Sequence, residues 1–91
     1  MWKSSLYQVR DYELDSMGMV ENGVYVQYMS HIRHKYLESK GMGFAFFKEH
    51  ELVPIVKSQE ILYRTPLLMG QSYYGTVEIE QDGAFKLIFK Q

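Results

Sequence analysis

The group best placed for chemistry in this sequence is the carboxylate of Asp15, in a predicted turn ahead of a predicted helix. A carboxylate at such a place can act as a base that activates water, or as a nucleophile that attacks a carbonyl carbon directly. Asp is also common at the first position of a turn, where its side chain caps the backbone. From the residues alone, the catalytic and the capping interpretations both stay open.

The start of that helix offers a second functional group, a set of backbone amides. The first N–H groups of a helix have no intrahelical partner and carry the positive end of the helix dipole, so they can stabilise an oxyanion. These amides fall around Asn22, Gly23 and Val24. Gly23 has no side chain and lets a carbonyl group approach the backbone closely. Asn22 either donates from its own amide or serves as the N-cap, and both roles can hold together.

No metal and no cofactor is expected. His31 and His34 are three residues apart and His50 follows a loop, which departs from the usual i, i+4 pair and supplies no clear third ligand. The chain has no cysteine, so it forms no disulfide and offers no thiolate nucleophile. It also lacks a phosphate-binding glycine-rich loop, a nucleophilic serine elbow and a dinucleotide fingerprint.

Composition indicates one globular domain over residues 1–91, in which 46% of the residues are hydrophobic. The net charge is −1 and no run of Lys and Arg occurs, so we expect no binding to nucleic acid. No apolar stretch is long enough to span a bilayer and no signal peptide precedes the patterned sequence, which makes the cytoplasm the expected location. The small core and the 15% aromatic share favour self-association.

One helix is predicted with particular clarity, over residues 24–40. No Pro or Gly interrupts it, and Gly41 stands where a helix stop favours a left-handed residue. Its apolar residues recur at helical spacing and form one stripe: Tyr25, Tyr28, Met29, Ile32 and Tyr36. After it, residues 43–52 predict a loop or a short helical turn. Their aromatic residues either line a tunnel for an apolar substrate or, more commonly, pack into the core: Phe44, Phe46 and Phe47.

The remaining patterned segments predict strands. A modest strand is expected over residues 6–14, a long one over 53–65, and a half-buried one over 72–80. Asp82 and Gly83 then give a strong hairpin signal, and Phe85, Leu87 and Phe89 alternate in the return strand. The resulting fold class is α+β, with one long helix packed on an antiparallel sheet.

Two stretches resemble the hotdog-fold acyl-CoA and acyl-carrier-protein thioesterases of the 4-hydroxybenzoyl-CoA thioesterase type. They are Val9 to Tyr25, which holds the turn and the helix start, and Tyr63 to Gln71. The resemblance implies hydrolysis of acyl thioesters without metal or cofactor, with a catalytic acid at Asp15. It also implies a homodimer or a higher homo-oligomer. Glu21 departs from the family pattern, because relatives carry a neutral residue there. Arg33 matches a family position and is expected to form an ion pair or to touch a partner subunit.

A rival function is a hotdog module without catalysis that binds acyl chains or only dimerises. The resemblance further implies one more strand beyond Gln91, between the return strand and the segment 53–65. We therefore expect that the chain is C-terminally shortened, that another chain fills this gap, or that the return strand closes directly onto 53–65. The dimer is expected to form by pairing of residues 53–65 across a two-fold axis.

Overall fold

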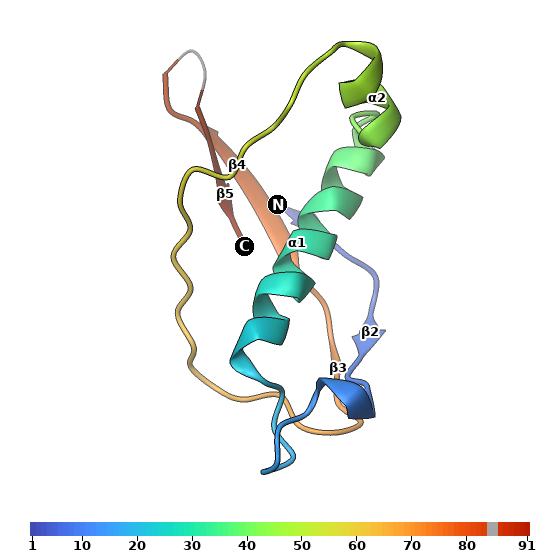
Figure 1. Ribbon diagram of the computed structural model, residues 1–91, viewed down its shortest axis with the longest axis vertical. Helices are drawn as coiled ribbons and strands as arrows, with labels where there is room; N and C mark the ends of the chain where they lie inside the picture. Colours follow the sequence, from blue (N-terminus) through green and yellow to red (C-terminus); the bar gives the residue numbers. More distant parts are fainter. Residues whose placement is uncertain (84–85) are drawn as a thin grey trace.

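The computed structural model describes residues 1–83 and 86–91. One long helix, α1 (Asn22–Ser39), lies against a layer of short antiparallel strands, and a short second helix, α2 (Phe44–Glu49), follows it (Figure 1). This is the α+β hotdog architecture that the sequence predicts. Because a lone helix can bury only one face, the sheet side of α1 holds the buried side chains.

The helix α1 buries the stripe that its spacing predicts. Tyr28 and Ile32 are buried on it, and Gly41, just beyond its end, adopts a left-handed φ of +75°. The prediction that Asn22 is the N-cap is wrong. Glu21 is the N-cap, and its extended backbone is fixed by a hydrogen bond from its N–H to the carbonyl of Glu13 at 3.1 Å. The helix therefore begins at Asn22, ahead of the expected Val24.

The strands form two small sheets. In one, β1 (Trp2–Lys3), β4 (Thr76–Gln81) and β5 (Leu87–Lys90) lie in the order β1-β4-β5; in the other, β2 (Tyr7–Gln8) pairs with β3 (Ser72–Tyr73). The predicted strand over residues 6–14 is mostly wrong, because only Tyr7–Gln8 is a strand. The chain then forms a single 3₁₀ turn, η1 (Asp11–Glu13), in which the N–H groups of Glu13 and Leu14 donate to the carbonyls of Arg10 and Asp11.

The predicted hairpin is confirmed in the described residues. Ile79 pairs with Phe89 and Gln81 pairs with Leu87 in an antiparallel register, and Val77 on β4 is only 1% exposed. Phe85, which was expected in the return strand, lies outside the described residues. Within the described chain β5 pairs with β4 alone, so the expectation that it closes directly onto residues 53–65 is wrong.

A break divides the predicted strand over 72–80 into β3 and β4. At the break, Gly75 faces the helix, and a Cβ atom there would lie 2.9 Å from Cγ2 of Ile32. Ser4 satisfies the backbone at this point, since its N–H donates to the carbonyl of Gly75 and its Oγ accepts the N–H of Gly75, both at 2.8 Å. The break thus lets the backbone approach α1 closely.

The prediction of a strand over residues 53–65 is wrong for the isolated chain. The segment is extended but forms no backbone hydrogen bond with any other described residue, so no sheet partner defines it as a strand. Its first eight residues are all exposed, with Val53 at 80% and Ile55 at 83%. Figure 1 shows it as the long trace that runs from α2 past β5.

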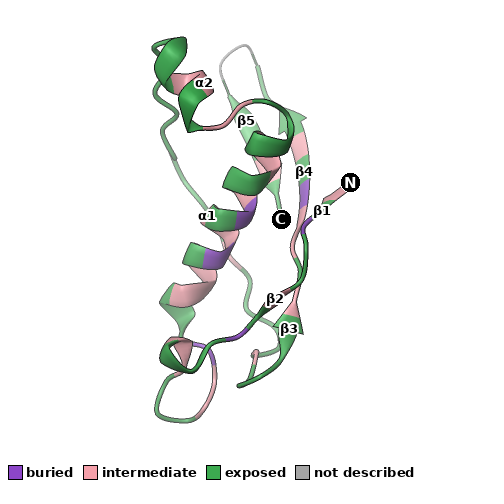
Figure 2. Ribbon diagram, turned by 90° about the vertical axis from the view of Figure 1, so that its right-hand side faces the viewer, coloured by how far each residue is buried: buried purple, intermediate pink, exposed green. Residues whose placement is uncertain are grey.

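The core is small. Its buried apolar residues lie on the inner face of α1, on β4 and on the segments that flank η1: Val9, Val20, Tyr28, Ile32 and Val77. Figure 2 shows buried segments on α1, on β4 and on the chain next to η1. None of the three phenylalanines of α2 is buried, and Phe44 is 77% exposed, so the core interpretation of that cluster is wrong. A short helix at the end of the molecule cannot reach the core.

Candidate active site

Asp15 lies at the start of a tight turn, as expected. Its Oδ1 oxygen accepts the backbone N–H groups of Met17 at 2.8 Å and Met19 at 3.1 Å, and its carbonyl accepts the N–H of Gly18 at 3.1 Å. Gly18 takes the left-handed φ of +78° that closes the turn. Asp15 therefore caps the turn, as one of the two interpretations predicts, and uses only Oδ1 to do so. Oδ2 has no hydrogen-bond partner among the residues that the structure describes, and the side chain is exposed.

The backbone amides at the start of α1 differ in their availability. The N–H of Val24 donates to the carbonyl of Glu21 at 2.9 Å, so this amide is occupied. The N–H groups of Asn22 and Gly23 donate to no acceptor within the described chain, as expected for the first turn of a helix. A Cβ atom built at Gly23 would meet no atom within 4 Å. Two of the three expected amides are therefore free, and the space beside Gly23 is open.

Asp15 and Asn22 line one groove of about 230 Å³ at the helix start. Residues 61–66, at the end of the extended segment, also line this groove. The phenol of Tyr63 donates to the carbonyl of Asn22 at 3.2 Å, and its ring meets the ring of Tyr25 edge-on at 5.6 Å. Gly23 and Val24 do not line the groove. The structure thus brings together Asp15 and Asn22, and leaves Gly23 and Val24 just outside.

Charge in the groove comes from Asp15 and Arg64 among its described lining residues. Glu21, the departure from the family pattern, is exposed and does not line the groove. Residue spacing in the sequence does not predict that Tyr63 and Arg64 line this groove. Their only signal was their place in the stretch from Tyr63 to Gln71, because no local pattern indicates which distant segment will cross a helix start.

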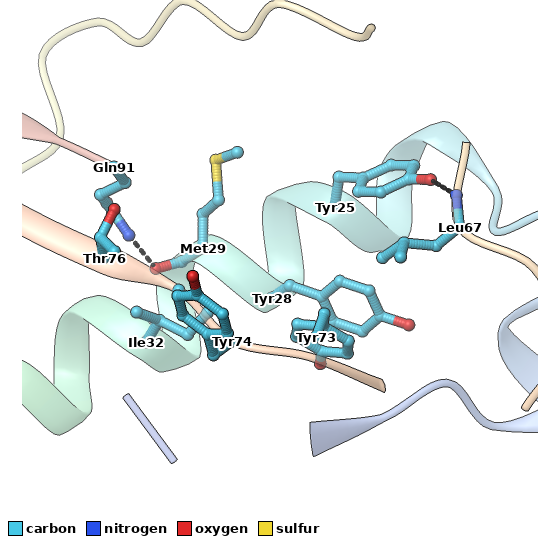
Figure 3. Close-up of a pocket in the computed structure, with 10 residues that line it drawn as sticks. Tyr25, Tyr28, Met29, Ile32, Leu67, Tyr73, Tyr74, Thr76 and Gln91 are labelled. Carbon is cyan, nitrogen blue, oxygen red and sulfur yellow. Dashed lines mark hydrogen bonds between the residues drawn. The ribbon is translucent and has the colours of Figure 1, made fainter. Parts of the chain in front are cut away.

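A second pocket, also of about 230 Å³, opens between α1 and the strands β3 and β4 (Figure 3). Tyr25 and Met29 line both this pocket and the groove. The phenylalanines of α2 line neither, so the tunnel that the sequence suggested for them does not form there. Aromatic side chains of α1 and β3 take that place, with Tyr28 stacked on Tyr73 at a centroid distance of 4.4 Å.

The histidines are used in aromatic packing. The ring of His31 meets Tyr7 edge-on at 5.5 Å, and that of His34 meets Phe44 at 5.2 Å. Burial lowers the pKa of His34, with a further contribution from the charge of Arg33. No group of three potential metal ligands occurs in residues 1–83 or 86–91.

Arg33 forms no ion pair with a described residue, in contrast to one of its expected roles. Its Nη1 donates to Oε1 of Gln91 at 3.3 Å, and its guanidinium lies 5.9 Å from the ring centre of Phe89. These contacts connect the helix to the end of β5. Over the same described residues, neither helix has the length and apolar character that crossing a bilayer requires.

Comparison with known proteins gives relatives in sequence and in fold. Two chloroplastic acyl-acyl carrier protein thioesterases of Arabidopsis thaliana are similar in sequence. ATL3 is 32% identical over 82 residues, which cover 90% of this chain and 43% of the relative. ATL2 is 30% identical over 84 residues, which cover 92% and 45%. The chain thus spans less than half the length of these relatives.

A solved structure shares the fold. The crystal structure of a hypothetical protein from Aquifex aeolicus superposes with a TM-score of 0.85 at 24% identity, over 93% of this chain and 69% of that one. The sequence model of one family matches residues 9–90, which include the turn of Asp15, the whole of α1 and the described part of the hairpin. The chain therefore belongs to the thioesterase-like superfamily.

Proposed function

We propose that this chain hydrolyses acyl thioesters, with Asp15 as the base or nucleophile and the first amides of α1 as the oxyanion site. The observation that carries the proposal is the shared groove: the carboxylate of Asp15 and the first residue of α1, Asn22, line the same cavity. A thioester bound there would lie beside the carboxylate and the start of α1, where the N–H groups of Asn22 and Gly23 donate to no described acceptor.

The turn suits the carboxylate to this role. Two backbone N–H groups hold Oδ1 and fix the orientation of the side chain, while Oδ2 stays free for chemistry. As a base, Oδ2 takes a proton from water as the water oxygen attacks the thioester carbon. The oxyanion of the tetrahedral intermediate then accepts hydrogen bonds from the free amide N–H groups. When the C–S bond breaks, the leaving sulfur receives the proton from Asp15, and a carboxylic acid and a thiol are released.

The substrate class is an acyl group on coenzyme A or on acyl-carrier protein. The two Arabidopsis relatives are named as thioesterases of the second kind, which supports this class. The groove walls are largely apolar apart from Asp15, Asn22, Arg64 and Thr65, which suits an acyl chain beside a polar thioester.

The test is hydrolysis of a panel of acyl-CoA thioesters of increasing chain length. The rate is measured from the release of free thiol. Asp15→Asn keeps an oxygen for the turn amides and removes the base, so kcat should fall by about 10²-fold or more. Asp11→Asn is the matched control, because Asp11 is an exposed carboxylate outside the groove whose Oδ1 accepts only the backbone N–H of the next residue, Tyr12, among the described residues. Full activity of Asp15→Asn, or an equal loss in both variants, would contradict the role of Asp15.

A second candidate is a hotdog module that binds acyl groups without catalysis. The favouring observation is that Oδ1 of Asp15 already caps its turn, which by itself explains an Asp at this position. This candidate predicts that the wild-type chain binds fatty acids but releases no thiol from any acyl-CoA of the panel.

We also propose that the chain forms a homodimer through residues 53–65. In the isolated chain this segment is extended, exposes apolar side chains such as Val53 and Ile55, and has no backbone partner among the described residues, which leaves it open to strand pairing with a second copy. In such pairing across a two-fold axis, the backbone N–H and C=O groups of each copy bond to those of the other copy. Because residues 61–66 also line the groove, the dimer would stabilise one wall of the proposed active site.

A further inference from the structure

Tyr63 connects the extended segment to the peptide group that carries the Gly23 amide. Its phenol donates to the carbonyl oxygen of Asn22 at 3.2 Å, and this carbonyl belongs to the same peptide group as the N–H of Gly23. That N–H donates to no acceptor within the described chain, and the space beside Gly23 is open. One peptide group therefore has a phenol on its oxygen and an unused N–H on its opposite side.

Contacts with the helix and with the segment ahead of it hold this phenol in place. The ring of Tyr63 meets the ring of Tyr25 edge-on at 5.6 Å. The hydroxyl of Tyr25 accepts the N–H of Leu67 at 2.9 Å (Figure 3), and the carbonyl of Leu67 accepts the N–H of Val20 at 2.9 Å. The position of the phenol is therefore fixed before any ligand binds, which is the condition for an electrostatic role in catalysis.

A hydrogen bond to the oxygen of a peptide group makes the N–H of that group a stronger donor, because the two bonds polarise the group in the same direction. A carbonyl oxygen has two lone pairs, so the carbonyl of Asn22 can accept the phenol in addition to a helix bond. The C=O and N–H bonds of a trans peptide point in opposite directions, so Tyr63 does not occupy the place of an oxyanion at Gly23. At 3.2 Å the bond is long for an O–H donor, as catalytic hydrogen bonds often are before substrate binds.

We propose that Tyr63 is a positioning residue for thioester hydrolysis: it holds and polarises the peptide group between Asn22 and Gly23, so that the N–H of Gly23 binds the developing oxyanion more strongly. The inference rests on the proposed function. Tyr63 acts on the oxyanion only through this peptide group. Its effect belongs to the transition state, because the negative charge on the oxygen develops only as the thioester is attacked.

The kinetic test is Tyr63→Phe, which removes the hydroxyl and keeps the ring that packs on Tyr25. Loss of a whole oxyanion donor lowers kcat by about 10²–10³-fold, and polarisation strengthens a hydrogen bond by about 10–30%. The kcat of Tyr63→Phe for acyl-CoA should therefore fall roughly two- to eightfold, with KM within about twofold of the wild-type value. Tyr36→Phe should keep the wild-type kcat, because the hydroxyl of Tyr36 has no described partner and Tyr36 lines neither the groove of Asp15 nor the pocket beside β3 and β4.

A double-mutant cycle tests whether Tyr63 acts through Gly23. In Gly23→Val the new side chain keeps the oxyanion away from the N–H, so Tyr63→Phe should cause no further loss of kcat in that background.

A second measurement examines the peptide group without catalysis. The amide nitrogen resonance of Gly23 responds to hydrogen bonding at the carbonyl that precedes it, so it should move upfield in Tyr63→Phe and stay in place in Tyr36→Phe.

Three outcomes would overturn the inference: a Gly23 resonance that Tyr63→Phe leaves in place, a raised KM with an unchanged kcat in this variant, or an equal loss of kcat in the wild-type and Gly23→Val backgrounds. A wild-type chain that releases no thiol from any acyl-CoA contradicts the proposed function instead. In that case the Gly23 resonance alone decides whether Tyr63 polarises the peptide group.

Discussion

The phenol of Tyr28, in the middle of α1, donates a 2.7 Å hydrogen bond to the carboxylate oxygen Oε1 of Glu13. The same oxygen accepts the backbone N–H of Arg10 at 2.8 Å, and the carbonyl of Glu13 accepts the N–H of Glu21 at 3.1 Å. Glu13 therefore connects the segment that carries Asp15 both to the interior of the helix and to the residue that precedes it.

Loss of this hydrogen bond should destabilise the fold. Tyr28→Phe keeps the stacking on Tyr73 but leaves the half-buried carboxylate of Glu13 without the phenol, so the free energy of unfolding should fall by about 1.5–3 kcal/mol. Urea unfolding followed by circular dichroism measures the change. Tyr36→Phe is the control, because the hydroxyl of Tyr36 has no partner among the described residues, and its effect should stay within about 0.5 kcal/mol. Equal losses would contradict a special role for the hydroxyl.

The same cluster predicts a loss of stability in base. Burial, and next the negative charge of Glu13, raise the pKa of Tyr73 to about 12; burial and the bond to Glu13 also raise the pKa of Tyr28. Between a pKa of about 10 for unfolded tyrosine and these higher values, the folded chain binds more protons than the unfolded chain. Stability is therefore fully present below about pH 10 and is lost as the pH rises through 12.

Urea unfolding from about pH 9 to pH 12 measures this loss, and Tyr73→Phe should show a shallower decline than the wild type. Parallel declines in both proteins would show that Tyr73 does not contribute to the pH dependence.

The sequence predicts the local elements of this fold better than the distant contacts. The helix α1 is predictable because Tyr28 and Ile32 repeat at helical spacing, and the hairpin because Asp82 and Gly83 favour a tight turn. The division of β3 from β4 is not predictable, since it depends on the approach of Gly75 to Ile32, which lies 43 residues earlier in the chain. Residues 53–65 have the composition of a strand, but composition cannot supply the neighbour to which a strand must bond.

The candidate site divides in the same way. The turn at Asp15 and the free amide of Asn22 are predictable from local rules for turns and helix ends. The occupation of the Val24 amide by the carbonyl of Glu21 depends on where the helix begins, and helix boundaries vary by one or two residues in any sequence-based prediction.

Gly23 offers a test of how closely substrate approaches the backbone. A Cβ atom there would meet no atom within 4 Å, so Gly23→Val should leave the fold nearly intact. If the thioester oxygen approaches the N–H of Gly23, the new methyl groups displace it, and kcat/KM for acyl-CoA hydrolysis should fall by about 10²-fold. Gln27→Val, an exposed substitution one turn later that lines neither space, is the control. Normal kinetics for Gly23→Val would rule out this approach.

The contact between Gly75 and Ile32 should be intolerant of added volume. Gly75→Ala places a methyl group against Cδ1 and Cγ2 of Ile32, and such overpacking costs about 1–3 kcal/mol of stability. Ile32→Ala alone should also destabilise, because it removes a buried side chain. The double variant should be more stable than the sum of the two losses implies, since the second change removes the clash. Strict additivity in urea unfolding would contradict direct contact between these two side chains.

The final prediction concerns self-association through residues 53–65. Ile55 is 83% exposed and apolar in the isolated chain, and a dimer formed by this segment would place it in the interface with the second copy. Ile55→Lys puts a charge into that interface in both copies and should raise the dissociation constant by at least about tenfold, as measured by sedimentation equilibrium. Leu6→Lys is the matched control, because Leu6 is 70% exposed but lies between β1 and β2, and the dissociation constant of this variant should match that of the wild type.

The dimer should also affect activity, since residues 61–66 line the groove of Asp15. Ile55→Lys should weaken thioester hydrolysis at low protein concentration, and the activity should recover at high concentration. A wild-type chain that sediments as a monomer at micromolar concentration, or an equal effect of both substitutions, would contradict the dimer.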